Sequence, residues 1–407
     1  MESKIEKKLL ILGAGEEQVS AISMAHLLGY KVIAVDGNKF ATGLLMADVG
    51  IHADIRDSKK MIKIAKRYIV DGVFCHAVEI PTVVAKIAHE LVLPGIPIEV
   101  AENATNKYKR IKILRDAGVP VANFRLVSNV NEAEKAAEEI GFPVVIKPLN
   151  RAGSRGVTLV RTKDEIARAI QEAKYFTNLS EYLVEEYMVG PELSTESVVY
   201  EGKIYTSCWA DRNYSKKELF YPYMIEDGGN LPTSVSKSML KKVEKVIEKT
   251  IKALGINMGA AKGDIIIKNN VPHVIEMAVR TSGGRFCDVK VPLSNGVNIL
   301  KPLIQMHMGD PVDLNDFKQK FEKAVVERTI FPKPGKIIDI KGINEAKSIP
   351  SVWKLHLNED VKVGNTIEPL RNHACKVGYV ITVADTLEKA VKDCEEAVSR
   401  IKISTRE

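Results

Sequence analysis

Two strand-forming segments close to residue 270 constrain this chain more than any other feature, because they bring ionisable side chains together. Residues 265–268 and 273–277 are joined by a two-asparagine turn, which is typical of a β-hairpin. Asp264 precedes the first segment, Glu276 lies in the second, and alternation along a strand can point both carboxylates to one face. Arg280 follows shortly after. Because Mg²⁺ prefers a few carboxylate oxygens plus phosphate oxygens, the pattern indicates a nucleoside triphosphate site; the alternative is a solvated hairpin with ordinary surface acids.

The length and composition indicate an enzyme of several domains. A chain of 407 residues can hold about two to four units of the usual size. Hydrophobic residues make up 45% and charged residues 27%, which is ordinary for a soluble globular enzyme. No window approaches the roughly 18 uninterrupted apolar residues of a membrane span, and the short apolar run near the start leads into a glycine turn instead of a cleavage site. We therefore expect a cytoplasmic protein with no membrane partner.

The cysteines and the net charge exclude further classes of protein. The five cysteines lie far apart and form no CxxC motif, which favours reduced thiols over a disulfide framework or a zinc site. A net charge of +7 is modest for this length, and no basic run is interleaved with aromatic residues. We therefore expect no nucleic-acid partner.

The first block of the chain, to about residue 100, alternates short apolar runs with helical patterns, which predicts a parallel βαβ arrangement. Its GAGEEQ segment resembles a dinucleotide fingerprint, but the third glycine of GxGxxG is missing, and Asp36 ends the second predicted strand. Either a cofactor loop or a simple strand-to-helix turn fits this segment.

A second block carries features that suit phosphate. Lys147 lies in the apolar strand FPVVIKP, where burial of its charge is costly without an anionic partner. The loop at residues 151–156 follows, and its small residues let backbone N–H groups approach phosphate oxygens. The alternative is a glycine hairpin turn beside a surface lysine.

Two more segments of this block suit a nucleotide and a carboxylate. Glu185, Glu186 and Glu192 flank an apolar segment and can accept hydrogen bonds from ribose hydroxyls, although each one singly suits a surface charge. The TSGGRF segment after Arg280 offers backbone N–H groups and Arg285 as a cradle for a carboxylate or an acyl phosphate. Its alternative is a glycine loop that simply turns the chain.

Taken in order, these residues resemble the ATP-grasp superfamily, in the branch that contains biotin carboxylase, the carbamoyl phosphate synthetase large subunit and the L-amino acid ligases. The resemblance implies an α/β fold with an N-terminal parallel βαβ (pre-ATP-grasp) domain at residues 1–100. It implies an ATP-grasp domain at 101–310, with a lid subdomain at about 120–190. A small α+β C-terminal lobe at 311–407 is expected to pack over this core, and its last helix is predicted to start after Asp385-Thr386.

The resemblance also implies roles for individual residues. Arg280 and Lys147 are expected to be catalytic, with Arg280 facing the acyl phosphate, and Asp264 and Glu276 are expected to bind the metal. The resemblance implies that Lys109 and Lys147 bind the nucleotide phosphates and that Ser154 lies in the lid loop. It implies that Glu185, Glu186 and Met188 belong to the segment that contacts adenine, and that Glu192 binds the ribose. The substrate residues implied are Arg280, Ser282, Gly283, Gly284 and Arg285.

The metal site departs from the family pattern in two ways. Many members have an asparagine two residues after the second acid, where this chain has Ala278, and Asp264 replaces a commoner glutamate. Both changes shorten or remove a metal ligand. The number of metal ions, one or two, therefore stays open at this point.

Three functions are compatible with these residues. The leading one is an ATP-dependent, ADP-forming ligase that activates a carboxylate as an acyl phosphate for attack by an amine, on an amino acid or a similar small metabolite. The second is a carbamoyl phosphate synthetase-like or carboxylase-like enzyme that activates bicarbonate, and the third is a non-catalytic ATP-binding regulatory protein. The cofactors expected are ATP and Mg²⁺ (or Mn²⁺), the partners are small-molecule carboxylate and amine substrates, and the resemblance allows a homodimer.

Overall fold

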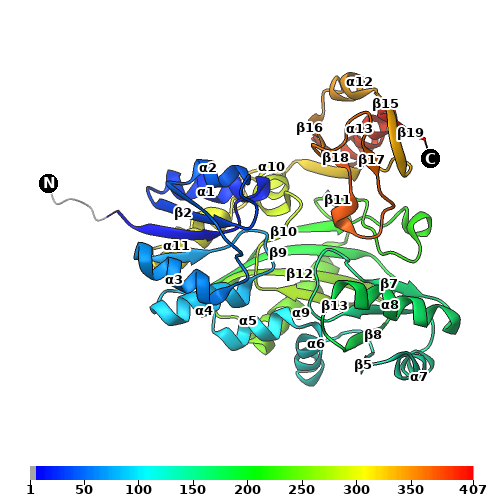
Figure 1. The fold of residues 1–407 in the computed structure, drawn as a ribbon, viewed down its shortest axis with the longest axis horizontal. Coiled ribbons are helices and arrows are strands. Elements are labelled where there is room, and N and C mark those ends of the chain that lie inside the picture. Colours follow the sequence, from blue (N-terminus) through cyan, green and yellow to red (C-terminus); the bar gives the residue numbers. More distant parts are fainter. Residues whose placement is uncertain (1–5, 407) are drawn as a thin grey trace.

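The computed structural model describes residues 6–406, which fold around four β-sheets (Figure 1). The first sheet is parallel, in the order β3-β2-β1-β4, and confirms the predicted βαβ arrangement. Its strands are almost wholly apolar because helices cover them. The strands are β1 (Lys8–Leu12), β2 (Lys31–Asp36), β3 (Val49–His52) and β4 (Gly72–Phe74), and the helices are α1 (Val19–Leu27), α2 (Thr42–Met46), α3 (Ser58–Tyr68) and α4 (Pro81–Leu91).

The GAGEEQ segment forms the turn between β1 and the following helix. Its Gly13 has a φ of 97°, and the backbone N–H of Ala14 donates to the carboxylate of Asp36 at 2.7 Å. This N–H is therefore already satisfied by the protein, which favours the reading of a strand-to-helix turn over that of a cofactor loop.

A small antiparallel sheet follows, in the order β5-β8-β6-β7, with two helices packed on it. Alanines at helical spacing on α7 and α8 form the buried side of this layer. Two connecting helices, α5 (Ile98–Thr105) and α6 (Lys107–Asp116), precede it. Its elements are β5 (Phe124–Val127), α7 (Val130–Ile140), β6 (Val144–Pro148), β7 (Thr158–Val160), α8 (Ile166–Phe176) and β8 (Tyr182–Glu186).

An eight-stranded antiparallel sheet forms the centre of the molecule, in the order β13-β12-β9-β10-β11-β14-β18-β16. It continues without a break from the central part of the chain into strands that come after residue 310. The domain boundaries given above stay a prediction. The strands are β9 (Glu192–Tyr200), β10 (Lys203–Arg212), β11 (Gly228–Leu231), β12 (Gly259–Lys268), β13 (Val271–Ala278), β14 (Ala324–Thr329), β16 (Val352–Leu357) and β18 (Gly378–Ala384); the helices are α9 (Lys237–Leu254), α10 (Val291–Asn295) and α11 (Leu300–His307).

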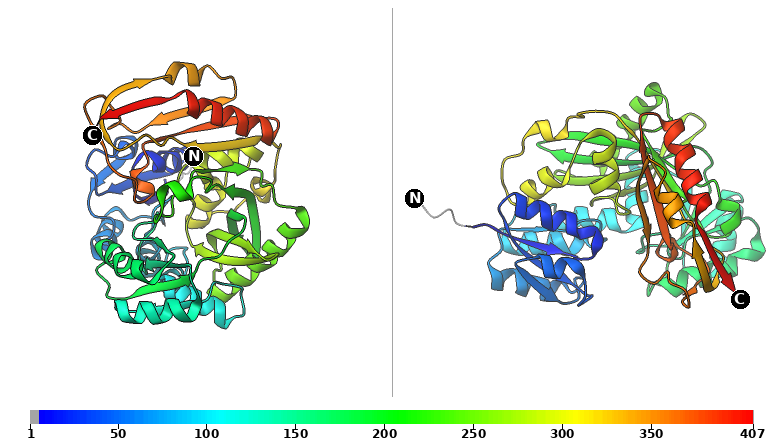
Figure 2. Two further views of the ribbon diagram at one scale, coloured as in Figure 1. Left: turned by 90° about the vertical axis from the view of Figure 1, so that its right-hand side faces the viewer. Right: turned by 90° about the horizontal axis from the view of Figure 1, so that it is seen from above.

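The last part of the chain adds a three-stranded sheet, β17-β15-β19. Helix α13 lies along β14 and β18 (Figure 2), and Thr386 caps its first turn by accepting from the N–H of Lys389, as the sequence predicts. The elements are β15 (Gly335–Lys341), α12 (Ile343–Lys347), β17 (Thr366–Ile367), α13 (Leu387–Arg400) and β19 (Lys402–Arg406). Within residues 6–406, no helix combines the length and the apolar character needed to cross a membrane.

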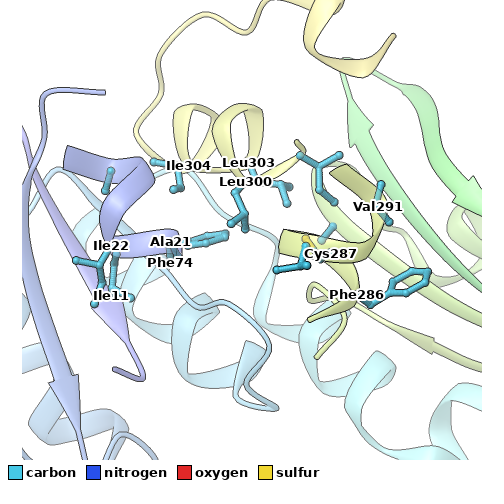
Figure 3. Packing of buried hydrophobic residues seen from close by; sticks show 14 of the residues in the cluster. Ile11, Ala21, Ile22, Phe74, Phe286, Cys287, Val291, Leu300, Leu303 and Ile304 are labelled. Atoms are coloured by element: carbon cyan, nitrogen blue, oxygen red, sulfur yellow. The ribbon is translucent and has the colours of Figure 1, made fainter. Parts of the chain in front are cut away.

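Buried apolar packing fixes the N-terminal sheet against the segment that follows β13 (Figure 3). Ile11 and Phe74 on one side and Leu300 and Leu303 on the other are at most 3% exposed. This shared core holds the carboxyl ends of the parallel strands next to the loop at residues 280–285. In open parallel sheets, ligands bind at those ends.

Candidate active site

A cleft of about 860 Å³ opens between the loops of the parallel sheet, the small antiparallel sheet, the central sheet and the segment before β18. Its volume is that of a typical ligand pocket. Its wall includes Glu79 from the loop after β4, Lys147 from β6, Asp264 from β12 and Lys376 before β18. The cleft thus gathers side chains that are far apart in the sequence. Of the residues predicted to act at the site, Lys109 is absent from its wall.

Lys147 is buried and has a carboxylate partner inside the protein. It is 6% exposed, and its ammonium pairs with Glu185, which is 7% exposed and lies on the neighbouring strand β8. The sequence reasoning expected phosphate to neutralise this lysine and Glu185 to lie near adenine. The structure instead pairs the two side chains, since a charge at this depth needs a partner before any ligand arrives.

Lys107, and not Lys109, faces the cleft, which corrects the prediction for the first phosphate lysine. Lys107 lines the cleft and its ammonium donates to the carbonyl of Arg151, whereas Lys109 is exposed on the outside of α6. Two positions along a helix correspond to a rotation of about 200°, so the two side chains point in opposite directions. Burial lowers the pKa of Lys107 to about 8, although the charge of Glu276 opposes the shift.

The remaining predicted nucleotide residues also line the cleft. Glu186 is ion-paired with Lys268 and accepts from the Asn123 side chain at 3.0 Å. Met188 is 9% exposed and packs on Ile266, which gives this wall an apolar patch. Burial raises the pKa of Glu192 to about 7, because the positive charge of Arg212, 3.9 Å away, only partly offsets the loss of water.

The predicted lid loop contacts the C-terminal part of the chain. The carbonyl of Gly153 accepts from the N–H of His373 at 3.1 Å, and the Ser154 hydroxyl lies 3.4 Å from His373 Nε2. Ser154 itself has a φ of 58°. Whether this loop moves when a nucleotide binds stays a prediction.

Asp264 and Glu276 lie opposite each other on the paired strands β12 and β13, because a β-bulge between Asp264 and Ile265 shifts the register by one residue and so brings both carboxylates to one face, as expected. The turn between the strands has both asparagines at positive φ, 50° and 62°, which matches the right-handed twist of a hairpin. Burial raises the pKa of Glu276, but Arg110 and then Lys262 outweigh it and lower the pKa below its usual range. The carboxylate oxygens on the cleft wall are hard donors of the kind that fit Mg²⁺ together with phosphate oxygens.

The far end of the cleft is built by the loop at residues 280–285. Arg280 is ion-paired with Glu79, and the N–H of Ser282 donates to the carboxylate of Glu196 at 3.1 Å. The N–H of Gly284 donates to Glu17 at 2.8 Å. Gly284 has a φ of 64°, a left-handed conformation that favours glycine.

Arg285 completes this loop. Its guanidinium donates to the carbonyl of Glu16 at 3.2 Å and pairs with Asp288 at 3.0 Å. The predicted substrate residues therefore lie together in one wall, against the loops that follow β1 and β4.

Sequence reasoning missed several residues of the cleft. Glu17 and Glu79 follow strands of the parallel sheet, so the rule that ligands bind at the carboxyl ends of such strands is a signal for them. Arg212 was also missed, because no local sequence pattern marks it. Its guanidinium contacts Asp264 at 3.0 Å and Glu226 at 2.8 Å. His373 and its neighbours come from a segment in which the sequence shows little chemistry.

Sequence models of two families match this chain. That of the phosphoribosylglycinamide synthetase ATP-grasp (A) domain matches residues 105–289, and that of the L-amino acid ligase C-terminal domain 2 matches residues 328–406. The uncharacterized protein y4rH of Sinorhizobium fredii is 28% identical over 345 residues, which are 83% of this chain and 69% of that protein. The formate-dependent phosphoribosylglycinamide formyltransferase of Wolinella succinogenes is 28% identical over 285 residues, 67% of this chain and 70% of that one.

A solved structure shares the fold over the whole length. The L-amino acid ligase from Bacillus licheniformis has a TM-score of 0.84 at 21% identity, with 99% of each chain covered. The parallel N-terminal sheet, the small antiparallel sheet and the central sheet enclose one cleft in the order that the sequence resemblance implies. The chain thus has the ATP-grasp fold, with an ATP-grasp domain matched over residues 105–289.

Proposed function

We propose that this protein uses ATP to activate the carboxylate of an amino acid or a similar small metabolite and joins it to an amine. One observation carries the proposal: a single cleft contains both the lysines and acids suited to a triphosphate and the arginine loop suited to a carboxylate. A phosphoryl donor and its acceptor need such a common cavity, because the reaction depends on alignment and charge neutralisation.

The nucleotide would occupy the part of the cleft between the small antiparallel sheet β5-β8-β6-β7 and the central sheet. Lys107 and Lys147 are suited to the phosphates, Met188 to the face of the base, and Glu192 to a ribose hydroxyl. Lys147 would share its charge between Glu185 and a phosphate oxygen, since an ammonium has three N–H donors.

Asp264 and Glu276 form the acidic pair beside which a divalent cation would bind. When bound, Mg²⁺ supplies positive charge against the phosphate oxygens, and Mn²⁺ is expected to substitute for it. Arg280 would stabilise the negative charge that develops on the transferred group, which lies at the end of the same wall.

The chemistry has two steps. A carboxylate oxygen of the substrate forms a bond to the γ-phosphorus of ATP while the bond to the β,γ-bridging oxygen breaks, which releases ADP and leaves an acyl phosphate. The amine then attacks the acyl carbon, loses a proton, and expels inorganic phosphate. Arg285, on the wall of the same cleft, is suited to hold the acyl group during both steps.

The test is to screen amino acids and related acids in pairs for ADP release. We expect ADP and phosphate only when one particular acid and one amine are present together. ADP release with bicarbonate alone would replace this function with a bicarbonate-activating one, and nucleotide binding without turnover in any mixture would indicate a regulatory protein. A cytoplasmic location and a homodimer remain predictions of the sequence.

A further inference from the structure

Two neighbouring residue pairs of β12 and β13 lie at the cleft, and three of these four residues, Lys262, Asp264 and Glu276, line its wall. Across β12 and β13, Lys262 lies opposite Ala278, and Asp264 lies opposite Glu276. Alternation puts Lys262 and Asp264 on one face of their strand, and both line the cleft. Ala278, at which the resemblance to the ATP-grasp superfamily implies an asparagine ligand, offers no donor atom. Lys262, which lies opposite Ala278 on the paired strand, is therefore the side chain best placed to substitute for the missing ligand.

The carboxylate of Asp264 is fully engaged within the protein. Its Oδ1 accepts from the Ser194 hydroxyl at 2.7 Å. Its Oδ2 is ion-paired with Lys262 and also with Arg212, whose Nη1 lies 3.0 Å away. Asp264 is 4% exposed, so these partners satisfy a charge that water does not reach. A metal at this carboxylate would have to displace a cation that is already there.

Glu276 differs from Asp264 in this respect. In the described part of the chain, its one ion pair is a long contact of 3.6 Å between its Oε1 and Arg110 Nη2. Its side chain is 25% exposed toward the cleft, whereas that of Asp264 is 5% exposed. Glu276 is thus the acid with oxygen atoms open to a metal.

We propose that the site holds one divalent cation, with Glu276 as its carboxylate ligand, and that the Lys262 ammonium takes the place of a second metal ion. Residues 6–406 contain no group of three or more His, Cys, Asp or Glu side chains placed to hold a metal. Mg²⁺ does not need one, because it commonly binds through one or two carboxylates, substrate phosphates and water.

Lys262 is suited to the second role. A lysine ammonium is a compact point charge with three donors, so it can keep Asp264 and also reach a phosphate oxygen. In two-metal sites, the second ion supplies that charge instead. The inference rests on the proposed function, because it assumes that a nucleotide binds in this cleft.

The experiment counts Mn²⁺ by electron paramagnetic resonance in the complex of the full chain with the non-hydrolysable imido analogue of ATP. We expect one Mn²⁺ per chain at saturation. Two Mn²⁺ per chain would overturn the inference while leaving the proposed function in place. Failure of the analogue to bind at all would refute the proposed function, and the inference with it.

Variants separate the roles of the two acids and the lysine. Lys262→Met combined with Ala278→Asn is expected to bind two Mn²⁺, and the control Lys203→Ala, at an exposed lysine outside the cleft, is expected to bind one. A double variant that folds, as judged by its melting curve, and still binds one Mn²⁺ would contradict the role of Lys262.

The acids provide a second measurement that does not depend on the double variant. Glu276→Gln is expected to abolish Mn²⁺ binding, and Asp264→Asn to weaken it about 10-fold, as loss of a residue outside the metal's own ligands does. Equal loss of Mn²⁺ in both variants would show that Asp264 is a ligand and would overturn the assignment.

Discussion

Variants of the Lys147–Glu185 ion pair should change the stability of the fold and the affinity for ATP independently of each other. Lys147→Ala removes the cation and leaves the Glu185 carboxylate, 7% exposed, without its partner. Loss of one member of a buried pair typically costs about 3–5 kcal/mol of the free energy of unfolding. Both side chains line the cleft, so water can reach the remaining carboxylate, and we expect a value near about 3 kcal/mol.

The matched variant is Lys147→Met combined with Glu185→Leu, which removes both charges and keeps their volume. Replacement of a whole buried pair by apolar groups is often neutral, so this double variant should recover most of the lost stability. Neither variant should bind ATP as well as the wild type, because both lack the cation that faces the phosphates.

Stability is measured by urea unfolding, with hydrogen exchange of β6 and β8 as the probe. ATP affinity is measured by calorimetric titration. Exchange reports the small antiparallel sheet itself, which matters because a chain of this size need not unfold in one step. If the single and double variants were equally unstable, the pair would not be coupled as the structure indicates. If ATP affinity were unchanged in both, Lys147 would not be a phosphate ligand.

Four further results are expected. Arg280→Ala should lower kcat strongly with little change in ATP affinity, the signature of an interaction made chiefly in the transition state, and a collapse of ATP binding instead would make Arg280 a nucleotide ligand. Lys107→Ala should weaken ATP binding in a calorimetric titration while Lys109→Ala does not, and equal effects would contradict the orientation of α6. Glu276→Gln should keep the circular dichroism spectrum and lose Mg²⁺-dependent ADP release; normal dependence would put the metal elsewhere. Residues 151–156 should gain hydrogen-exchange protection when nucleotide binds, and equal protection in both states would refute a lid.

The sequence was sufficient for those parts of the fold that local patterns encode. The β12–β13 hairpin follows from strand alternation and a two-asparagine turn, but the alignment of Asp264 with Glu276 depends on a β-bulge beside Asp264 that no local pattern marks. The orientation of α6 was not predictable in this way, because its inner face carries Arg110, which is 4% exposed and so interrupts the apolar pattern. Arg110 Nη1 donates to the carbonyl of Ala104 at 2.7 Å, and this hydrogen bond compensates for the burial of the guanidinium. A helical hydrophobic pattern cannot predict such a contact.

Long-range pairing accounts for the other differences. The partner of Lys147 lies on a strand that is distant in sequence, and nothing near Glu185 distinguishes it from a surface acid. Likewise, β14, β16 and β18 read as part of a separate lobe, but backbone pairing joins them to the central sheet. Such pairings depend on how whole strands fit together, and local propensity does not encode that.

Pairing of the cleft's charges before any ligand arrives has a consequence for specificity. Lys147 holds Glu185 and Arg280 holds Glu79, while Lys290 and Glu327 form a third pair at 2.8 Å. An unpaired charge at such depth would be costly, so the protein supplies its own counterions. A phosphate or carboxylate that enters must therefore compete with a protein carboxylate for each cation. A neutral analogue of the same shape cannot do so, and it would leave the original pairs in place. The cleft should consequently discriminate by charge more sharply than by size.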